Sequence, residues 1–291
     1  MGIRIGEISY TNILPMFYYM DRAMLLDKGC SFIPAIPSEL NTRMANGTID
    51  VGGISSFSYG EHIHDYEILP DLSVSSPDAV GSIFLFSKKP IEQLSGEKIA
   101  LTSSSATSVN LLKIILHKFY DQSVTYTVEE PDYLRMMERY SAALLIGDDA
   151  IMAKRHGNAH SYTYDLGEIW NKETGFPMTY AVFAVRKNIA SREPALLKEV
   201  MNQFQNSKKR CQDDHYQEMI RFIQSKFNGS TQFWMSYFNG LNHDLTDTHV
   251  RGLLYYYRLA YQMGLLDHQV QNLEIWHPDS TRQSVSLGGS E

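Results

Sequence analysis

The sequence predicts an α/β protein of two domains, and three observations support this fold class. Four segments each pass from a short apolar run through a polar hinge into a helical pattern, which is typical of parallel strands joined by right-handed crossovers. Two similar apolar runs, 82–90 and 180–188, each end near a basic pair and enclose about a hundred residues. The chain of 291 residues is also long enough for about two ordinary domains.

The four segments give the predicted elements in chain order. Their apolar runs are β-prone, and their hinges are rich in Ser, Thr, Asn and Asp. Ligands bind beyond the carboxyl ends of parallel strands, so we expect the four hinges to face one cleft. The predicted strands are 3–8, 49–53, 98–101 and 142–146, the hinges are 9–12, 54–56, 102–108 and 147–149, and a helix follows each hinge.

We interpret the two similar runs as the points at which the chain leaves one domain and returns to it. Domain 1 is then discontinuous, 1–86 and 182–291, and domain 2 is the insertion 87–181. Helical patterns in 193–227 and 246–264 should cover domain 1. The last twelve residues offer little to bury and should be mobile. The alternative is one large domain in which both runs are ordinary strands.

Charge, apolar content and cysteine count narrow the class of protein. The net charge of -7 and the pI of about 5.8 argue against a broad nucleic-acid surface, because phosphate binding depends on clustered Lys and Arg. The N-terminus has no apolar segment of signal-peptide length, and no apolar run approaches the roughly 20 residues that span a bilayer. Cys30 and Cys211 lie far apart without metal-site spacing. We therefore expect a cytoplasmic protein that binds neither nucleic acid nor membrane.

The hinge 102–108 is unusually rich in hydroxyl groups. Six of its seven residues are Ser or Thr, and we call this segment the serine loop. One hydroxyl is enough to cap the helix that follows, so the surplus suggests a ligand with several acceptors. Thr107 and Ser108, with the backbone N–H groups of the helix start, would form an anion site without a formal charge, and Ser103 and Ser105 would add donors.

Seven short motifs then identify a family that the chain resembles. They are SYTNILP at 9–15, IDVGGISS at 49–56, LPDLSV at 69–74, VGSI at 80–83, the serine loop, LIGDDA at 145–150, and DLG at 165–167 followed by Trp170 and TGFP at 174–177. With these seven motifs in this order, the chain resembles the chorismate dehydratases of the futalosine route to menaquinone, the MqnA family. The C-terminal third carries no comparable motif.

The resemblance implies a fold, a reaction and a substrate. The fold is that of type II periplasmic binding proteins, with the ligand in a cleft between two domains. The reaction converts chorismate to 3-[(1-carboxyvinyl)oxy]benzoate and water: the ring carbon that bears the enolpyruvyl ether loses a proton, and hydroxide leaves from the neighbouring carbon. Aromatisation drives this elimination, so the resemblance implies a hydro-lyase that needs no cofactor and no metal. Chorismate carries two carboxylates, which suits the donors of the serine loop.

The resemblance also assigns a role to Asn12, which holds a catalytic place in the family. An amide is not a base at neutral pH, so the proton acceptor is left open between the substrate's own enolpyruvyl carboxylate and Asp148, which a closed cleft would make more basic. Ser55 and Ser82 are expected to reach the cleft from the other domain. The complete set of expected substrate-binding residues is Ser55, Ser56, Ser82, Ser103, Ser105, Thr107 and Ser108.

The sequence leaves two other functions open. The sister enzyme of the same pathway, 1,4-dihydroxy-6-naphthoate synthase, shares the fold and acts on a larger substrate. A non-catalytic binding protein for an anionic aromatic compound is the alternative outside enzymes.

His62 and His64 form an H-x-H pair, but no third ligand follows at a metal-site spacing, so we expect no metal site there. The oligomeric state cannot be inferred.

Overall fold

The computed structural model describes residues 2–156, 162–278 and 283–286, and within them the strands form two sheets. The seven-stranded sheet has the order β12-β11-β4-β10-β3-β1-β2. Its strands are β1 (Arg4–Ile8), β2 (Ser31–Ala35), β3 (Val51–Ser55), β4 (Tyr66–Ser76), β10 (Met178–Arg186), β11 (Asn272–Ile275) and β12 (Gln283–Ser286). The five-stranded sheet has the order β7-β6-β8-β5-β9. Its strands are β5 (Ile83–Ser87), β6 (Lys98–Thr102), β7 (Thr125–Glu129), β8 (Ala142–Ile146) and β9 (Tyr162–Asp165).

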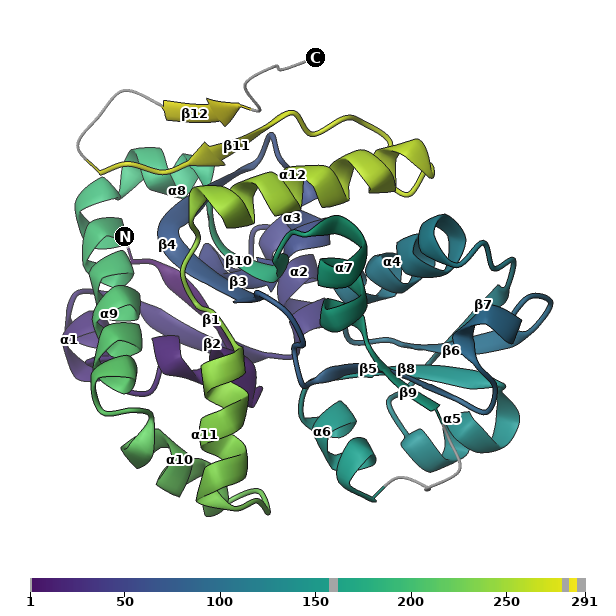
Figure 1. The fold of residues 1–291 in the computed structure, drawn as a ribbon. Coiled ribbons are helices and arrows are strands. Elements are labelled where there is room, and N and C mark those ends of the chain that lie inside the picture. The colour runs from purple at the N-terminus through teal and green to yellow at the C-terminus, as the bar shows by residue number, and fades with distance from the viewer. Residues whose placement is uncertain (1, 157–161, 279–282, 287–291) are drawn as a thin grey trace.

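Each sheet and its helices form one lobe, and Figure 1 shows the two lobes side by side. The larger lobe carries α1 (Arg22–Asp27), α2 (Pro37–Ala45), α3 (Ser56–Glu61), α8 (Lys187–Arg192), α9 (Pro194–Asp213), α10 (Gln217–Gln224), α11 (Thr231–Gly240), α12 (Asp247–Gln262) and the 3-10 helix η1 (Thr11–Met16). The smaller lobe carries α4 (Ala106–Ile114), α5 (Tyr133–Arg139), α6 (Gly147–His156), α7 (Leu166–Thr174), the 3-10 helix η2 (Ile91–Gln93) and the π-helical turn η3 (Ile115–Phe119).

The predicted α/β class is confirmed, and the four predicted strands appear as β1, β3, β6 and β8. Parallel pairing joins β1 to β2 and β3, and β6 to β7 and β8. The sheets are mixed, because β10 and β5 run antiparallel to their neighbours. The chain enters each of these two strands from the other lobe. The strand therefore runs in the opposite direction to the strands beside it.

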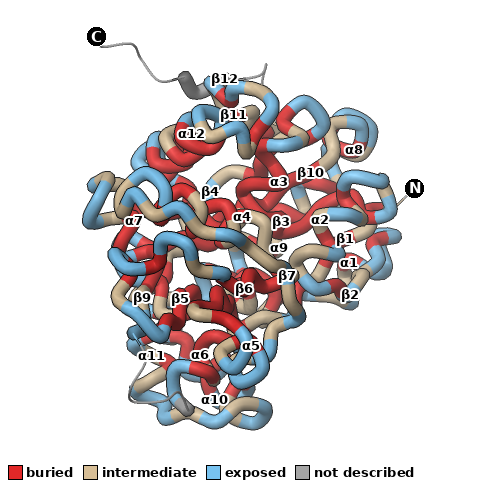
Figure 2. The backbone as a smooth tube through the Cα atoms, turned by 90° about the vertical axis from the view of Figure 1, so that its right-hand side faces the viewer, coloured by how far each residue is buried: buried red, intermediate tan, exposed pale blue. Residues whose placement is uncertain are grey.

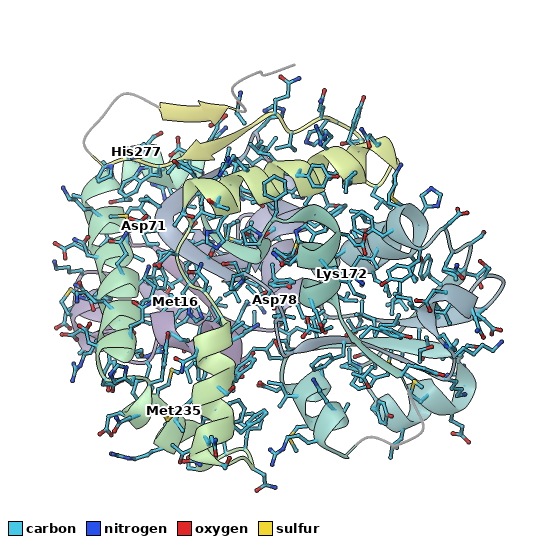
Figure 3. All side chains as sticks on the ribbon, in the orientation of Figure 1. Met16, Asp71, Asp78, Lys172, Met235 and His277 are labelled. Atoms are coloured by element: carbon cyan, nitrogen blue, oxygen red, sulfur yellow. The ribbon has the colours of Figure 1, made fainter. Side chains whose placement is uncertain are left out.

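The chain passes between the lobes within 77–82 and again within 175–177. The strand β5, most of which we assigned to domain 1, pairs in the smaller sheet, whereas β10 pairs in the larger one. The domain limits that we expect from the sequence remain a proposal. Asp78, labelled in Figure 3, lies on the first crossing, where its carbonyl accepts a hydrogen bond of 2.8 Å from the Ser76 hydroxyl.

One carboxylate ties the first crossing to the start of α7. Asp165, at the end of β9, accepts hydrogen bonds from the backbone N–H groups of Val80 (3.0 Å), Gly81 (2.7 Å), Gly167 (2.9 Å) and Glu168 (3.3 Å). The first two donors lie on the first crossing, and the other two begin α7 of the smaller lobe. The carboxylate therefore satisfies two backbone groups of the first crossing and two at the start of α7.

The core lies along the strands of both sheets, which Figure 2 shows in red. All five residues of β8 are buried, as expected of an apolar strand covered on both faces. The predicted helical stretch 193–227 divides into α9 and α10, and the stretch 246–264 contains α12. Helix α12 packs on β10 and α3 and also touches α4 of the smaller lobe. Within the tail that we expected to be mobile, residues 283–286 form β12, and its other residues lie outside the described part.

No helix in the described part of the chain combines the length and the apolar character that a membrane crossing requires.

Candidate active site

A cavity lies between the two lobes, at the carboxyl ends of β1, β3 and β8. Its empty space is about 510 Å³, with open solvent at its mouth included. All four predicted hinges contribute to its wall. The wall is formed by Ile8, Tyr10, Asn12, Ile13, Pro37, Gly53, Ser55, Val74, Ile83, Ser105, Ser108, Ile146, Gly147, Tyr180 and Ala181.

The wall of this cavity is polar at several points but contains no ionisable acid or base of the Asp, Glu, Lys, Arg or His type among the described residues. Three helices of eight residues or more begin at the wall instead. Pro37 is the first residue of α2, Ser105 is the N-cap of α4, and Gly147 is the first residue of α6. The helix dipole gives each such terminus a partial positive charge. The arrangement therefore favours an anionic ligand without a cationic side chain.

Asn12 is the second residue of η1 and faces the cavity. Its side-chain amide has no hydrogen bond to any described residue, so both its N–H donors and its oxygen remain available to a ligand. Its backbone carbonyl accepts a hydrogen bond of 2.8 Å from Nε2 of His243. The sequence prediction of Asn12 as a site residue thus agrees with its position, and its catalytic role stays a prediction.

Two hydroxyl groups of the serine loop reach the cavity. Ser105 caps α4, because its Oγ accepts the N–H of Ser108 at 3.2 Å. The Ser105 hydroxyl donates to the Ser108 hydroxyl at 3.1 Å, which leaves the proton of Ser108 free for a ligand. Ser103 does not reach the cavity wall. It lines a neighbouring groove that shares Ser105 with the cavity and extends between α2, α3 and β7.

Thr107 lies outside the cavity wall, and its hydroxyl joins the lobes. It donates to the Tyr180 carbonyl at 2.9 Å, accepts the Phe57 N–H at 3.0 Å, and pairs with the Ser55 hydroxyl at 2.7 Å. Ser55 Oγ in turn accepts the N–H of Thr107 at 3.0 Å. Thr107 is fully buried, and these contacts use the whole hydrogen-bonding capacity of its hydroxyl. Ser55 keeps one lone pair and still contributes to the cavity wall.

Ser56 and Ser82 were expected to bind substrate, but neither lies in the cavity wall. Both are fully buried, and each hydroxyl lacks a partner at hydrogen-bond distance among the described residues. The backbone carbonyl of Ser82 accepts the Gly147 N–H at 2.7 Å, which places Ser82 directly behind the start of α6.

Asp148 follows Gly147 and turns away from the cavity towards η1. The Thr11 hydroxyl donates to its Oδ1 at 2.6 Å, which makes a second polar contact between the lobes. Burial raises the pKa of Asp148 to about 6, although the hydrogen bonds to Thr11 oppose this shift. A carboxyl group with such a pKa is partly protonated near neutral pH, so it is suited to proton transfer if a ligand reaches it.

Sequence reasoning missed three features of the site. Tyr10 packs against Gly147, which has a φ of +60° and leaves no room for a Cβ. Tyr180 contributes the carbonyl that Thr107 holds. His243 comes from the C-terminal third, where no motif pointed to the site. The tyrosines lie beside or within segments that the patterns singled out, whereas no signal in the sequence connects His243 with Asn12.

Among the described residues, no group of three His, Cys, Asp or Glu side chains is placed to hold a metal ion. His62 lies 3.7 Å from Asp65, and the His64 ring lies 6.0 Å from the ring of His268. His62 therefore contacts a residue three positions later, and His64 lies beside a histidine from the segment that follows α12.

Solved structures of low sequence identity share this two-lobed fold. A protein from Archaeoglobus fulgidus superposes with a TM-score of 0.73 at 18% identity, covering 91% of this chain and 98% of that one. The alkanesulfonate-binding protein SsuA from Xanthomonas axonopodis pv. citri has a TM-score of 0.68 at 16% identity, covering 92% and 95% of the two chains. The periplasmic aliphatic sulphonate-binding protein SsuA from Escherichia coli has a TM-score of 0.65 at 15% identity, covering 92% and 94%. The predicted periplasmic-binding-protein-like fold is confirmed.

Sequence comparison identifies the family. A chorismate dehydratase from Thermus thermophilus is 31% identical over 199 residues, which cover 63% of this chain and 69% of that enzyme. The profile of a family described as menaquinone biosynthesis matches residues 3–262, which include all seven motifs and the whole cavity wall. The chain therefore belongs to the menaquinone biosynthesis family.

Proposed function

We propose that this protein is a chorismate dehydratase, a hydro-lyase of the futalosine route that forms 3-[(1-carboxyvinyl)oxy]benzoate and water. The similarity to the Thermus thermophilus enzyme supports the reaction, and the family match supports the pathway. The proposal includes chorismate as the small-molecule substrate and the cytoplasm as the location.

The observation that carries the proposal is the combination of an uncharged cavity wall with three helix N-termini and an unpartnered Asn12 amide. Chorismate is a compact dianion, so its two carboxylates need donors spread around a small space. Helix N-termini and the hydroxyl of Ser108, whose proton has no acceptor among the described residues, supply such donors. Dipolar donors also hold a dianion without the long flexible side chains that a salt bridge would need to immobilise.

The proposed mechanism assigns orientation to Asn12 and base catalysis to the substrate. The enolpyruvyl carboxylate removes the proton from the ring carbon that bears the ether, and the electrons of that C–H bond form the third double bond of the ring. The neighbouring C–O bond breaks, and the departing hydroxide takes the proton from the enolpyruvyl carboxylic acid, which gives water and regenerates the carboxylate. Asn12 donates an amide N–H to the departing oxygen and stabilises its developing charge. The absence of a carboxylate from the described cavity wall favours the substrate as its own base.

Asp148 is the alternative base in this proposal. Its raised pKa suits the role, but its Oδ1 is held by Thr11 and the side chain is not part of the cavity wall. Asp148→Asn keeps the size and the acceptor for Thr11 while removing the ionisable group. Full turnover in this variant would exclude Asp148 as the base, whereas a loss of several orders of magnitude in an intact fold would assign the base to it.

The proposed function is tested by incubating the pure protein with chorismate and following the aromatic product by absorbance and mass. Asn12→Ala should lower kcat by about 100-fold to 1,000-fold, the usual effect of losing one donor to a developing oxyanion. Asn46→Ala, at the end of α2, removes an asparagine that bonds only locally to Thr48 and should retain turnover. Tight chorismate binding without turnover would favour the binding-protein alternative. Turnover of the naphthoate precursor instead of chorismate would favour the sister enzyme.

A further inference from the structure

His243 makes a hydrogen bond to Asn12 from the loop between α11 and α12. The side chain is buried, with 1% of the residue exposed. Its Nε2 lies 2.8 Å from the Asn12 carbonyl oxygen, which only accepts hydrogen bonds, so Nε2 carries the proton. Burial lowers the pKa of His243 to about 4, and the ring is therefore a neutral donor at physiological pH. Its Nδ1 has no hydrogen-bond partner in the described part of the chain.

The Asn12 carbonyl needs this donor because of the sequence of η1. In a 3-10 helix the carbonyl of one residue accepts the N–H of the residue three positions later. For Asn12 that residue is Pro15, which has no N–H. His243 supplies the missing donor from a segment 231 positions away in the sequence. The orientation of the Asn12 peptide thus depends on a side chain outside its own helix.

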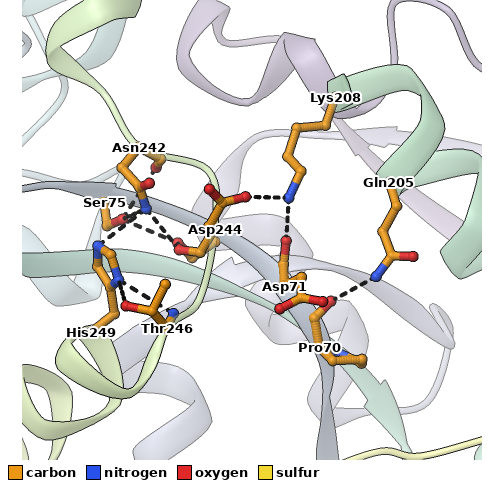
Figure 4. Close-up of polar contacts among 10 residues, drawn as sticks. Pro70, Asp71, Ser75, Gln205, Lys208, Asn242, Asp244, Thr246 and His249 are labelled. Carbon is orange, nitrogen blue, oxygen red and sulfur yellow. Dashed lines mark hydrogen bonds and ion pairs between the residues drawn. The ribbon is translucent and has the colours of Figure 1, made fainter. Parts of the chain in front are cut away.

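The backbone around His243 is fixed to β4. The N–H and C=O groups of Asn242 pair with those of Ser75 at 2.8 and 2.9 Å, and the His243 carbonyl accepts the Ser73 N–H at 3.0 Å. The Asn242 side chain donates to the Ser75 hydroxyl at 2.8 Å and to the Asp244 carbonyl at 2.7 Å (Figure 4). These contacts leave the residue before His243 little freedom to move.

The residue after His243 is held by an ion pair, also drawn in Figure 4. The ammonium group of Lys208, on α9, lies 2.6 Å from Oδ1 of Asp244 and 2.5 Å from the carbonyl oxygen of Asp71. The Lys208 side chain is only 7% exposed, whereas the Asp244 side chain is 46% exposed, so the pair is shielded from solvent on the lysine side alone. Asp71 itself has a φ of 58°, a conformation that needs such support. The loop therefore presents the imidazole from a rigid base.

We propose that His243 is a positioning residue for the Asn12 amide. By fixing the Asn12 peptide plane, the Nε2–H group sets the direction in which the Asn12 side chain projects into the cavity. Its effect on turnover rests on the proposed function, whereas its effect on the Asn12 geometry does not.

The test compares two variants of similar size that differ in one donor. His243→Gln places an amide N–H near the position of Nε2, and His243→Met provides no donor. We expect His243→Met to lower kcat by about tenfold to 100-fold with little change in KM, because a small displacement of a catalytic group has effects of this size. His243→Gln, which keeps a donor, should retain most of the wild-type kcat. In an Asn12→Ala background, His243→Met should cause little further loss, since its effect passes through Asn12.

Ser207→Ala is the matched control. The buried Ser207 hydroxyl donates to the Pro15 carbonyl at 2.8 Å and accepts the Tyr19 N–H at 2.9 Å, so this variant also removes a side-chain hydrogen bond to η1 without touching Asn12. It should lose stability, by about 1–3 kcal/mol, while keeping kcat. Equal kcat losses in His243→Gln, His243→Met and Ser207→Ala would overturn the proposal, and so would full additivity of His243→Met with Asn12→Ala.

A second readout separates this proposal from the proposed function. If the wild-type protein does not convert chorismate, the proposed function fails, and crystal structures of the wild type and His243→Met decide the positioning role. A rotated Asn12 peptide and a displaced Asn12 amide in the variant would support it. An unchanged Asn12 would overturn it.

Discussion

Replacement of Thr107 by Val tests the contact between the lobes that the structure assigns to its hydroxyl. Valine has nearly the same shape but cannot pair with Phe57, Tyr180 or Ser55. The Phe57 N–H and the Tyr180 carbonyl would then be buried without this partner. Each such group costs about 1–3 kcal/mol, so the variant should lose about 2–6 kcal/mol in the free energy of unfolding.

Thr107→Ser is the control, because it keeps the hydroxyl and removes one buried methyl group at a cost of about 1 kcal/mol. Urea unfolding followed by tryptophan fluorescence measures both variants, and the m-value reports whether unfolding remains a single transition. The reasoning is refuted if the Val and Ser variants unfold at the same urea concentration. That result would mean that solvent or a local shift satisfies the groups that Thr107 serves.

Three further predictions concern the cavity and the crossings. Asp148→Asn should raise the free energy of unfolding by up to about 3 kcal/mol above pH 6, because folding raises the pKa of Asp148 from 3.8 to about 6 and its ionisation then destabilises the folded protein. The gain should disappear as the pH falls below 3.8, where Asp148 is protonated in both states. Urea titrations at several pH values measure it. Gly53→Ala should weaken chorismate binding about tenfold by calorimetry, since its Cβ would lie 2.4 Å from Cδ1 of Ile13 in the cavity wall. Asp165→Asn should cost about 2–4 kcal/mol in the free energy of unfolding in urea, because an amide NH2 would face backbone donors. An unchanged midpoint would show that the first crossing and the start of α7 do not depend on this carboxylate.

Much of the architecture is readable from local patterns. The order of apolar run, polar hinge and helix predicts β1, β3, β6 and β8, and the rule for parallel strands brings their hinges to one cavity. The direction of β5 and β10 was not predictable in this way, because it depends on which lobe the chain comes from. The strand β2 contains Pro34, which an edge position tolerates because its missing N–H costs no ladder bond there.

The chemistry of the site was only partly predictable, because a hydroxyl's role depends on its neighbours in space. Ser105, Thr107 and Ser108 look equivalent in the sequence, yet Thr107 is saturated by groups 50 or more positions away and the other two line the cavity. His243 illustrates the same limit. The sequence shows that Pro15 removes a donor, but only the folded chain reveals which side chain replaces it.

The central claim is that dipoles and neutral donors hold a dianion between the lobes. A crystal structure with the stable product 3-[(1-carboxyvinyl)oxy]benzoate tests it most directly. We predict both carboxylates within hydrogen-bond distance of the starts of α2, α4 or α6, with the Asn12 amide against the ring edge. A product molecule whose carboxylates pair with Lys or Arg side chains outside this cavity would contradict the account.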